Sequence, residues 1–545
     1  MKRILILCTA FFLLSDCAFS KDNELLSKDF SHYFNYKIYL KNTSQHTSFK
    51  PYINANLDIT QVIDSIYPYD KNIGKLKQRF FYNYPLIISE DDYRIVAYPL
   101  VNFSKGVDLI NDKATFVNTR GFITKGRIGK NVFFFSSFKE NQAIFPDYLH
   151  TFIDEKKVVP GQGYRRKFKE TGYDYAMSSG NVTILLSNIF TIQFGHGKHF
   201  IGDGYRSLLL SDNTFNYPFL RIQSKLNNIQ YTNLYTEFQD INYFLNNNID
   251  NYDQMGYAKK YMSSHYLSYK LNKKLELSLF ESVIWRTNHA PGANGFDLNY
   301  LNPVAMLRPI EFSINSPDNV LLGSNIKYVM PYNSYTYAQI ILDEFSLNEI
   351  KNDRNWWGNK FGYQIGCKAF NAFSINNLTL QTEYNWVRPY TYAHYNPQQN
   401  YAHYNQPLAH PLGANFSETL FLANYWKGRL AVNLKLIKAK YGGSIPGDSI
   451  SYGNDLYMST GNFEDPSGYT HSGRPSDNDI LMYQGNMTDI AIISFTSSYI
   501  INPKINLKIM LGYTFRDIQN QFSNNQTSFL EFGLKTDLFN YYYDF

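Results

Sequence analysis

The chain has 545 residues, of which 17% are aromatic and 18% are charged, and its mean hydropathy is −0.37. The formal net charge of +6 is mild and spread along the chain, so it does not indicate nucleic-acid binding. Two of the three cysteines, Cys8 and Cys17, lie near the N-terminus. The remaining chain therefore has no disulfide framework, which excludes a small disulfide-stabilised secreted domain.

The N-terminus has the pattern of a secretory signal peptide over residues 1–20. Two basic residues precede an apolar run over residues 4–14, and a small-x-small motif follows at residues 18–20. The run is too short for a membrane helix. Cys17 leaves lipidation open as an alternative, although Asp16 is an unfavourable residue directly before a lipidated cysteine.

The next segment, residues 21–90, mixes helical spacing with a cluster of Lys and Arg. It is predicted to be a partly helical periplasmic or plug segment that lies before the main domain or folds into it. The main domain is predicted to cover residues 91–545.

From about Arg94 onward, apolar and polar residues alternate with a period of two, as in strands that have two different faces. The clearest alternation covers residues 377–386, 429–436 and 505–515. Each run is about ten residues long, the length that a tilted strand needs to cross a bilayer. At about 25 residues per strand and connection, we expect an all-β fold, a transmembrane outer-membrane β-barrel of about 18 antiparallel strands.

The connections between these strands have two sizes. Residues 427–428 and 501–504 form short turns, whereas residues 288–319, 388–415 and 441–487 form long loops rich in Gly, Pro, Asn, His and Tyr. Short turns on one rim and long loops on the other are typical of bacterial outer-membrane barrels. A soluble β-sandwich is the alternative, but it would need a second sheet to cover each apolar face.

The C-terminal stretch alternates from Ser528 to Leu538 and then continues with five aromatic residues that end at Phe545. A barrel has no edge because its last strand pairs with its first. The stretch is therefore predicted to be the closing strand. The aromatic residues after it are predicted to lie at the membrane–water interface.

Residues 194–222 carry charges that suit a polar barrel lumen. GHGKHF lacks the third glycine of a dinucleotide-binding motif, and His196 and His199 are unlikely metal ligands in an extended, glycine-rich segment. Mutual bracing of charges is therefore favoured over ligand binding. The residues predicted to form the lumen charge network are Asp203, Arg206, Asp212, Arg221, Arg308, Glu311, Asp343, Glu344 and Arg388.

No catalytic residues, metal or cofactor are predicted. Asp343 and Glu344 are adjacent on an expected strand, so they point to opposite faces and do not flank one glycosidic bond. Pairing with Arg308 or Arg388 is expected instead. A GxSxG nucleophile motif is missing from the sequence.

Several blocks in the middle of the chain, taken together, resemble the Wzi-type capsule-assembly family, and more closely its RemB-type branch associated with gliding motility. These blocks are FGHGKHFIGDGYRSLLLSD (194–212), LNYLNPVAMLRPIEFSINSPDN (298–319), ILDEFSLNEI (341–350), WVRPYTYAH (386–394) and NYAHYNQPLAHPLGANFSE (400–418). The resemblance implies a barrel of about 18 strands and an N-terminal helical portion that plugs the periplasmic side. It also implies an outer face that binds or organises surface polysaccharide without catalysis.

The loop over residues 386–418 contains YAHYN twice. Tyr rings can stack on sugar C–H surfaces while His, Asn and Gln offer hydrogen bonds. Two alternatives stay open: the loop packs on its own barrel, or its histidines bind a metal. Trp356 and Trp357 suit either a rim at the membrane interface or a stacking platform. The glycan-binding candidates are Tyr392, His394, Tyr395, Tyr401, His403, His410, Trp356 and Trp357.

The sequence thus predicts a non-catalytic barrel of the outer membrane that binds or organises capsule or exopolysaccharide and supports adhesion or gliding motility. Its expected partners are outer-membrane lipid, surface polysaccharide, and secretion or motility machinery. A pore or transporter for small solutes is the main alternative, and a barrel-embedded hydrolase is the less favoured one.

Overall fold

The structure is a computed structural model. It describes residues 27–41, 44–53, 59–68, 72–244, 257–286, 296–304, 306–314, 318–352, 354–461, 463–464, 470–471 and 473–545. The predicted signal peptide and the lipidation candidate Cys17 lie outside the described residues.

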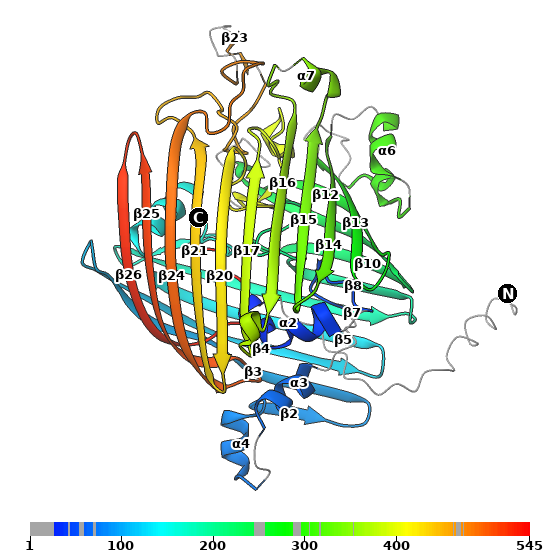
Figure 1. Ribbon diagram of the computed structural model, residues 1–545, viewed down its shortest axis with the longest axis vertical. Helices are drawn as coiled ribbons and strands as arrows, with labels where there is room; N and C mark the ends of the chain where they lie inside the picture. Colours follow the sequence, from blue (N-terminus) through cyan, green and yellow to red (C-terminus); the bar gives the residue numbers. More distant parts are fainter. Residues whose placement is uncertain are drawn as a thin grey trace, which may run out of the picture.

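The described chain forms one closed antiparallel barrel of 18 long strands (Figure 1), which confirms the predicted fold class. The strands are β3 (Tyr93–Asp108), β4 (Lys113–Ile128), β5 (Val132–Ile144), β7 (Gly172–Leu185), β8 (Phe190–Gly197), β10 (Tyr217–Leu226), β11 (Ile229–Phe244), β12 (Tyr257–Lys270), β13 (Leu275–Arg286), β14 (Asn319–Met330), β15 (Ser334–Glu344), β16 (Lys360–Phe370), β17 (Leu378–Val387), β20 (Phe416–Lys427), β21 (Leu430–Gly443), β24 (Asn486–Asn502), β25 (Leu507–Asn520) and β26 (Asn524–Thr536).

Shorter elements decorate this barrel. β2 (Leu86–Ser89) pairs with β3 and β6 (Arg166–Phe168) pairs with β7. Three small sheets pair β1 (Phe49–Lys50) with β9 (Phe200–Ile201), β18 (Ala402–His403) with β19 (Gln406–Pro407), and β22 (Phe463–Glu464) with β23 (Thr470–His471). The α-helices are α2 (Lys28–Tyr36), α3 (Ile59–Ile66), α4 (Lys75–Phe81), α5 (Asp147–Lys156), α6 (Leu307–Ile314) and α7 (Leu347–Lys351). The π-helix η1 (Lys37–Lys41) continues α2, and short 3-10 turns are η3 (Leu298–Leu301), η4 (Ala372–Ser374) and η5 (Pro397–Gln399). None of the described helices has the length and apolar character needed to cross a membrane.

The alternation read from the sequence separates the two faces of the wall. On β25, Leu511 points outward and is 49% exposed, whereas the neighbouring Met510 points inward and is 2% exposed. The polar residues Lys508 and Arg516 share the inward face with Met510. Apolar side chains that face outward dissolve the wall in lipid, while the polar lumen pairs its own charged groups.

The barrel closes where it was predicted to close. β26 pairs with β3 from Phe529 opposite Asp108 to Lys535 opposite Asn102. Without this pairing both strands would leave backbone groups unpaired in lipid.

The predicted place of the last aromatic residues was wrong. After Thr536 the chain turns inward, and Tyr542 in the lumen is 3% exposed. Asp544 lies among these aromatic residues and is buried with them. A buried carboxylate needs hydrogen-bonded or charged partners, and the lumen supplies them whereas the apolar interface does not.

The two rims of the barrel differ in their connections. The described parts of the long connections lie at the end that carries α6, α7 and β23, which we name the loop end (Figure 1). These parts are residues 296–304, 306–314, 388–415, 444–461 and 473–485. Helices α3 and α4 lie at the opposite rim, which we name the turn end.

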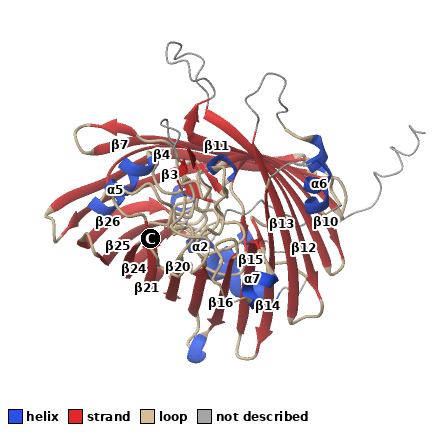
Figure 2. Ribbon diagram, turned by 90° about the horizontal axis from the view of Figure 1, so that it is seen from above, coloured by secondary structure: helices blue, strands red, loops and turns tan. Residues whose placement is uncertain are grey.

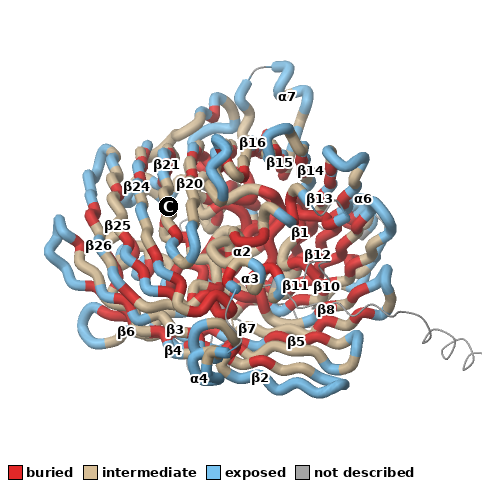
Figure 3. Tube along the Cα trace, turned by 60° about the horizontal axis from the view of Figure 1, so that its bottom comes forward, coloured by how far each residue is buried: buried red, intermediate tan, exposed pale blue. Residues whose placement is uncertain are grey.

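Four segments that are far apart in the sequence fill much of the lumen, and we name them here. They are the N-terminal plug (residues 27–41 and 44–53), the inward loop (198–216), the outer loop (388–415) and the C-terminal tail (537–545). Seen from above, α2 and loop chain occupy the middle of the barrel (Figure 2). With the turn end brought forward, the central chain is largely buried (Figure 3).

Candidate functional site

A buried charge cluster joins three of the lumen segments to the wall. The Arg206 Nη2 atom lies 2.8 Å from Glu418 Oε1 on β20, and its Nη1 atom lies 2.9 Å from Asp544 Oδ1 on the C-terminal tail. Lys435 Nζ on β21 lies 2.5 Å from Asp544 Oδ2. His410 Nε2 on the outer loop donates to Glu418 Oε2 at 2.8 Å. Two cations therefore meet two carboxylates, and the cluster locks inward loop, outer loop and tail together.

The protonation states fit this arrangement. Burial opposes the charged form of Asp544, but Arg206 and Lys435 outweigh it and hold the pKa of Asp544 below its usual range. Burial lowers the pKa of His410, and its Nδ1 accepts a hydrogen bond from the backbone N–H of Leu412 at 3.1 Å. A neutral imidazole with Nε2 protonated satisfies both contacts.

A second junction ties the N-terminal plug to the same segments. The Lys28 ammonium lies 4.6 Å from the ring centre of Phe200, 4.4 Å from that of Tyr205 and 4.7 Å from that of Tyr542. It also donates to the Tyr542 hydroxyl at 2.5 Å. Burial lowers the pKa of Lys28 to about 7. Cation–π contacts of this kind gain strength when the cation is removed from water.

The predicted bracing partners of Asp203 and Asp212 were wrong, because neutral donors hold both carboxylates. Asp203 accepts from Thr47 at 2.6 Å and from Asn325 at 3.2 Å. Asp212 accepts from the Asn540 amide and the Tyr542 hydroxyl, both at 2.7 Å. Both residues do lie in the lumen, where they bind the N-terminal plug and the C-terminal tail.

Arg221 on β10 contacts the N-terminal plug through its backbone and an aromatic ring. It donates to the carbonyl oxygen of Pro51 at 2.8 Å and to Gln223 Oε1 at 2.6 Å, and it lies 4.3 Å from the ring centre of Phe49. The expectation that Asp203 or Asp212 would brace Arg221 was therefore also wrong.

Arg308 and Glu311 do not belong to the lumen network. They form an i,i+3 pair at 3.5 Å on α6, at the loop end. Their spacing of three residues on one helix makes a local pair, so the predicted contact between Arg308 and the carboxylates of β15 does not form.

The two carboxylates at the end of β15 have different partners. Glu344 pairs with Lys360 at 3.1 Å, and Asp343 accepts from the backbone N–H of Tyr392 at 2.8 Å. Arg388, the other predicted partner, instead donates to the Trp356 carbonyl oxygen at 3.4 Å.

Glu383 on β17 is a central lumen residue that the sequence reasoning missed. Its carboxylate accepts from the backbone N–H groups of Tyr205 at 2.7 Å and Arg206 at 3.1 Å, and from the Tyr337 hydroxyl at 2.7 Å. Glu418, Lys435 and Asp544 were missed as well. The available signal was that Glu383 stands at an inward position of a predicted alternating strand.

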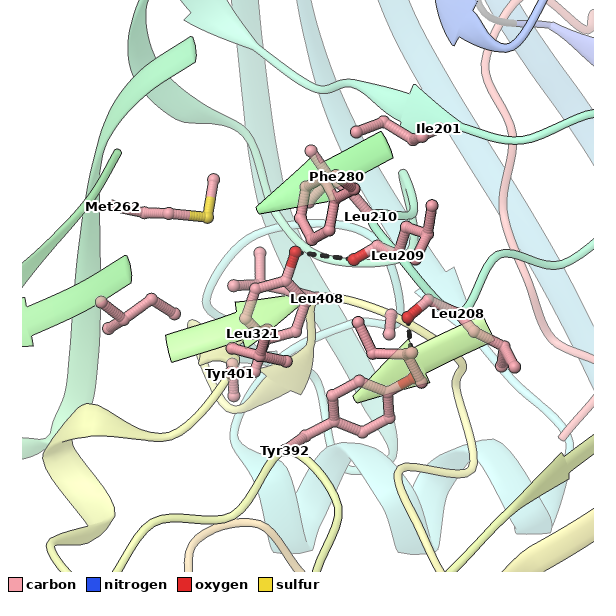
Figure 4. Packing of buried hydrophobic residues seen from close by; sticks show 14 of the residues in the cluster. Ile201, Leu208, Leu209, Leu210, Met262, Phe280, Leu321, Tyr392, Tyr401 and Leu408 are labelled. Atoms are coloured by element: carbon pink, nitrogen blue, oxygen red, sulfur yellow. Dashed lines mark hydrogen bonds between the residues drawn. The ribbon is translucent and has the colours of Figure 1, made fainter. Parts of the chain in front are cut away.

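The repeated YAHYN motif places Tyr392 and Tyr401 against the inward loop (Figure 4). Their ring centres are 5.7 Å apart in a stacked arrangement, and their hydroxyls donate to the carbonyl oxygens of Leu208 at 2.7 Å and Leu209 at 2.6 Å. Both rings are fully buried. They offer no face to a saccharide here, and their contacts fit the alternative that the loop packs on its own barrel.

His403 and His410 are also interior residues. Burial lowers the pKa of His403 to about 3. Its Nδ1 accepts from the backbone N–H of Gln239 at 3.0 Å, and its Nε2 donates to the carbonyl oxygen of Asn216 at 3.2 Å. Both ring nitrogens are therefore used in packing the outer loop. Within the described chain, no group of three His, Cys, Asp or Glu residues is placed to hold a metal ion.

The remaining glycan-binding candidates lie at the loop end, and we name Trp356, Trp357 and Tyr395 the outer aromatic group. The two Trp ring centres are 5.9 Å apart, and Tyr395 is 50% exposed. His394 is nearly buried beneath Tyr395, with ring centres 4.3 Å apart.

The connection between β21 and β24 links the members of the outer aromatic group. The guanidinium of Arg474 lies 3.9 Å from the ring centre of Trp357 and donates to the carbonyl oxygen of Thr460. Ser459 donates to the carbonyl oxygen of Tyr395 at 2.8 Å. This connection therefore contacts both Trp357 and Tyr395 at the loop end.

Comparisons with known proteins give structural likeness without sequence likeness. No protein-family model matches the chain, and no curated protein sequence matches it. Among solved structures, the chain is similar to Wzi, an outer-membrane protein involved in group 1 capsule assembly in Escherichia coli and described as a carbohydrate-binding β-barrel. The TM-score is 0.52 at 11% identity, covering 95% of this chain and 100% of that one.

The chain is also similar to two Pseudomonas porins. OprD of Pseudomonas aeruginosa gives a TM-score of 0.41 at 11% identity, covering 82% of this chain and 94% of that one. A BenF-like porin from Pseudomonas fluorescens gives a TM-score of 0.40 at 9% identity, covering 81% and 97%. The likeness to Wzi shows a common barrel fold, so the resemblance read from the sequence is supported at the level of the fold.

Proposed function

We propose that this protein is a non-catalytic barrel of the bacterial outer membrane that binds or organises cell-surface polysaccharide. The observation that carries the proposal is the outer aromatic group at the loop end, in which Tyr395 is 50% exposed and the two Trp residues are half-buried. This group lies above a lumen that the protein's own chain largely fills. In outer-membrane barrels the longer loops face the cell exterior, where capsule or exopolysaccharide lies. Wzi, which shares the fold, is described as carbohydrate-binding.

Within this proposal the ligand contacts are Trp356, Trp357 and Tyr395, with His394 beneath them. Ring faces suit the C–H surfaces of sugars. The neighbouring guanidinium of Arg474 pairs with Asp477 and lies against the ring of Trp357, so it holds that ring in place. The buried residues Tyr392, Tyr401, His403 and His410 position the loop from inside. A role in adhesion or gliding motility, a relation to RemB-type proteins and contact with secretion machinery belong to the same proposal.

Polysaccharide binding is tested with the purified barrel and surface polysaccharide extracted from the producing strain. Changing Trp356, Trp357 and Tyr395 to Ala is expected to weaken binding at least about tenfold, since each stacking contact is worth on the order of 1 kcal/mol. The matched control is Tyr332→Ala, because Tyr332 is 94% exposed but lies in a turn between β14 and β15 at the other end.

Both variants must keep the heat-modifiable gel mobility of a folded barrel before binding is compared. Equal binding by wild type and triple variant, or an equal loss in Tyr332→Ala, would contradict the proposal. A deletion strain that keeps its surface polysaccharide, adhesion and spreading would contradict the cellular role.

A further inference from the structure

The C-terminal tail lies between two cavities of the lumen. One, of about 310 Å³, is lined by α2, the inward loop and the inner wall at β17, β20 and β21. The other, of about 300 Å³, is lined by α5 and the inner wall at β3, β4, β5, β25 and β26. Both cavities touch Asp537, Phe539 and Tyr541 of the tail, so the tail is the partition between them.

The tail occupies this place without joining the wall. β26 ends at Thr536, and the tail lies outside every sheet that the described residues form. Side chains hold its backbone. Arg516 donates to the carbonyl oxygen of Phe545 at 2.9 Å, and the Tyr148 hydroxyl donates to the carbonyl oxygen of Tyr543 at 3.0 Å. Departure of the tail from the lumen would therefore break no ladder of the barrel. It would break the ion pairs of Asp544 with Arg206 and Lys435.

The tail also supports the helix that covers the second cavity. Phe545 packs on Phe152 of α5 with ring centres 4.8 Å apart, and Tyr148 of α5 holds Tyr543. Departure of the tail would remove the partition and these supports of α5 in one step.

The wall beneath the tail is basic. Four inward side chains from four strands line the second cavity, whereas Glu531 is the acidic residue that the strands contribute there. The other two acidic lining residues, Asp537 and Asp544, belong to the tail. The four inward basic residues are Lys139, Lys435, Arg516 and Lys535, and the exposed Lys105 of β3 also lines the cavity.

All four of these basic groups contact the tail: Lys139 donates to the Tyr541 hydroxyl, and Lys535 lies 3.5 Å from Asp537. Lys435 pairs with Asp544 at 2.5 Å, and Arg516 binds the Phe545 carbonyl oxygen. Without the tail, Lys435 would lose its carboxylate and keep the Tyr205 hydroxyl at 3.1 Å, and Arg516 would lose its carbonyl acceptor. The two cations would then attract anions.

We propose that the C-terminal tail is a removable stopper over a passage for small anions that runs along the inner wall of β21, β25, β26 and β5. Rings of basic side chains select anions in other pores, and here the tail carboxylates neutralise the wall while the passage is closed. This function is separate from polysaccharide binding at the loop end, and either can fail without the other.

The passage is tested by conductance in planar bilayers with potassium chloride as the probe. A chain that ends at Thr536 is expected to conduct at least about tenfold more than the wild type. In a salt gradient its reversal potential is expected to shift toward the equilibrium potential of chloride. Because loss of the tail can impair folding, full-length Asp544→Asn is the second variant. This substitution removes the charge that pairs with Arg206 and Lys435. It is expected to lengthen the time for which the barrel conducts, relative to the wild type.

The matched control is Asp489→Asn, since Asp489 pairs with Lys440 at 3.4 Å at a half-exposed position of β24 and does not line either cavity. In the tail-deleted chain, Lys139→Glu with Lys535→Glu is expected to move the reversal potential toward potassium. The proposal is overturned if both tail variants fold but conduct like the wild type. Cation selectivity in the tail-deleted chain, or a reversal potential unchanged by the two Glu substitutions, would overturn it as well.

Discussion

At the scale of single residues, Arg206 is a buried cation that two carboxylates of the lumen share. Its guanidinium binds Glu418 and Asp544, and the side chains of Arg206 and Glu418 are 1% and 0% exposed. A buried ion pair gains little over a well-packed apolar pair, but removal of one partner leaves an uncompensated charge. The stability of the lumen packing therefore depends on Arg206 being present.

Arg206→Gln is expected to lower the free energy of unfolding by about 3–5 kcal/mol, because Glu418 and Asp544 lose their shared cation. Urea titration of the folded barrel in detergent micelles measures the change. The control is Lys113→Gln, which breaks an exposed 2.7 Å pair with Asp147 and is expected to cost less than about 1 kcal/mol. Equal effects of the two substitutions would show that the lumen cluster does not hold the segments together.

At the scale of elements, each wall strand has two faces that meet different solvents. On β26, Phe532 is 59% exposed toward the lipid side, while its neighbours Glu531 and Gly533 face the lumen. Gly533 also permits the closing seam, since a Cβ atom there would lie 2.6 Å from the Cβ of Ser104 on β3. Two features thus restrict the residues of β26: the alternation between its two faces, and the close approach of its backbone to β3 at the seam.

Phe532→Arg is expected to destabilise the barrel by about 2–4 kcal/mol in lipid vesicles, because it places a charge on the lipid face. Urea unfolding followed by gel mobility measures the loss. Asn524→Arg, at the first residue of the same strand, is the control and is expected to cost about 1 kcal/mol or less. A tolerated Phe532→Arg would mean that this face does not meet hydrocarbon.

At the scale of the whole molecule, the barrel is a closed wall around a lumen that the chain itself fills. In the sequence, the plug comes before the wall strands and the tail comes after them. The inward and outer loops are connections between wall strands. The plug, the inward loop and the tail meet at Lys28, Arg206 and Asp544. The outer loop joins them through His410, which binds Glu418. The molecule is therefore a closed cylinder whose lumen is largely filled by its own chain.

Two exposed apolar positions at opposite ends test the orientation. Val304 is 81% exposed in the connection between β13 and β14, and Tyr332 is 94% exposed in the turn between β14 and β15. In chains that also carry Cys367→Ser, Val304→Cys is expected to react with a membrane-impermeant maleimide on intact cells. Tyr332→Cys is expected to react only after the cells are permeabilised. The reverse labelling pattern would show that the loop end faces the periplasm. That result would remove the basis for polysaccharide binding at the loop end.

The sequence by itself determined the wall of this protein. A period of two is a local pattern that can be read within about ten residues, so the strands, their approximate number, the two sizes of connection and the closing role of Ser528–Thr536 were predictable. Residues such as Glu383 and Glu418 stand at inward positions of these strands, but their partners cannot be read from the same pattern.

Only the tertiary structure decided how the lumen is filled. Arg206 and Asp544 are 338 positions apart, and Tyr392 meets Leu208 from 184 positions away. Such pairs leave no periodic signal, because each depends on where loops fold after the wall has closed. The membrane interface suits the aromatic rings of the tail, but the buried Asp544 needs cations as partners. Only the closed lumen brings Arg206 and Lys435 together around it.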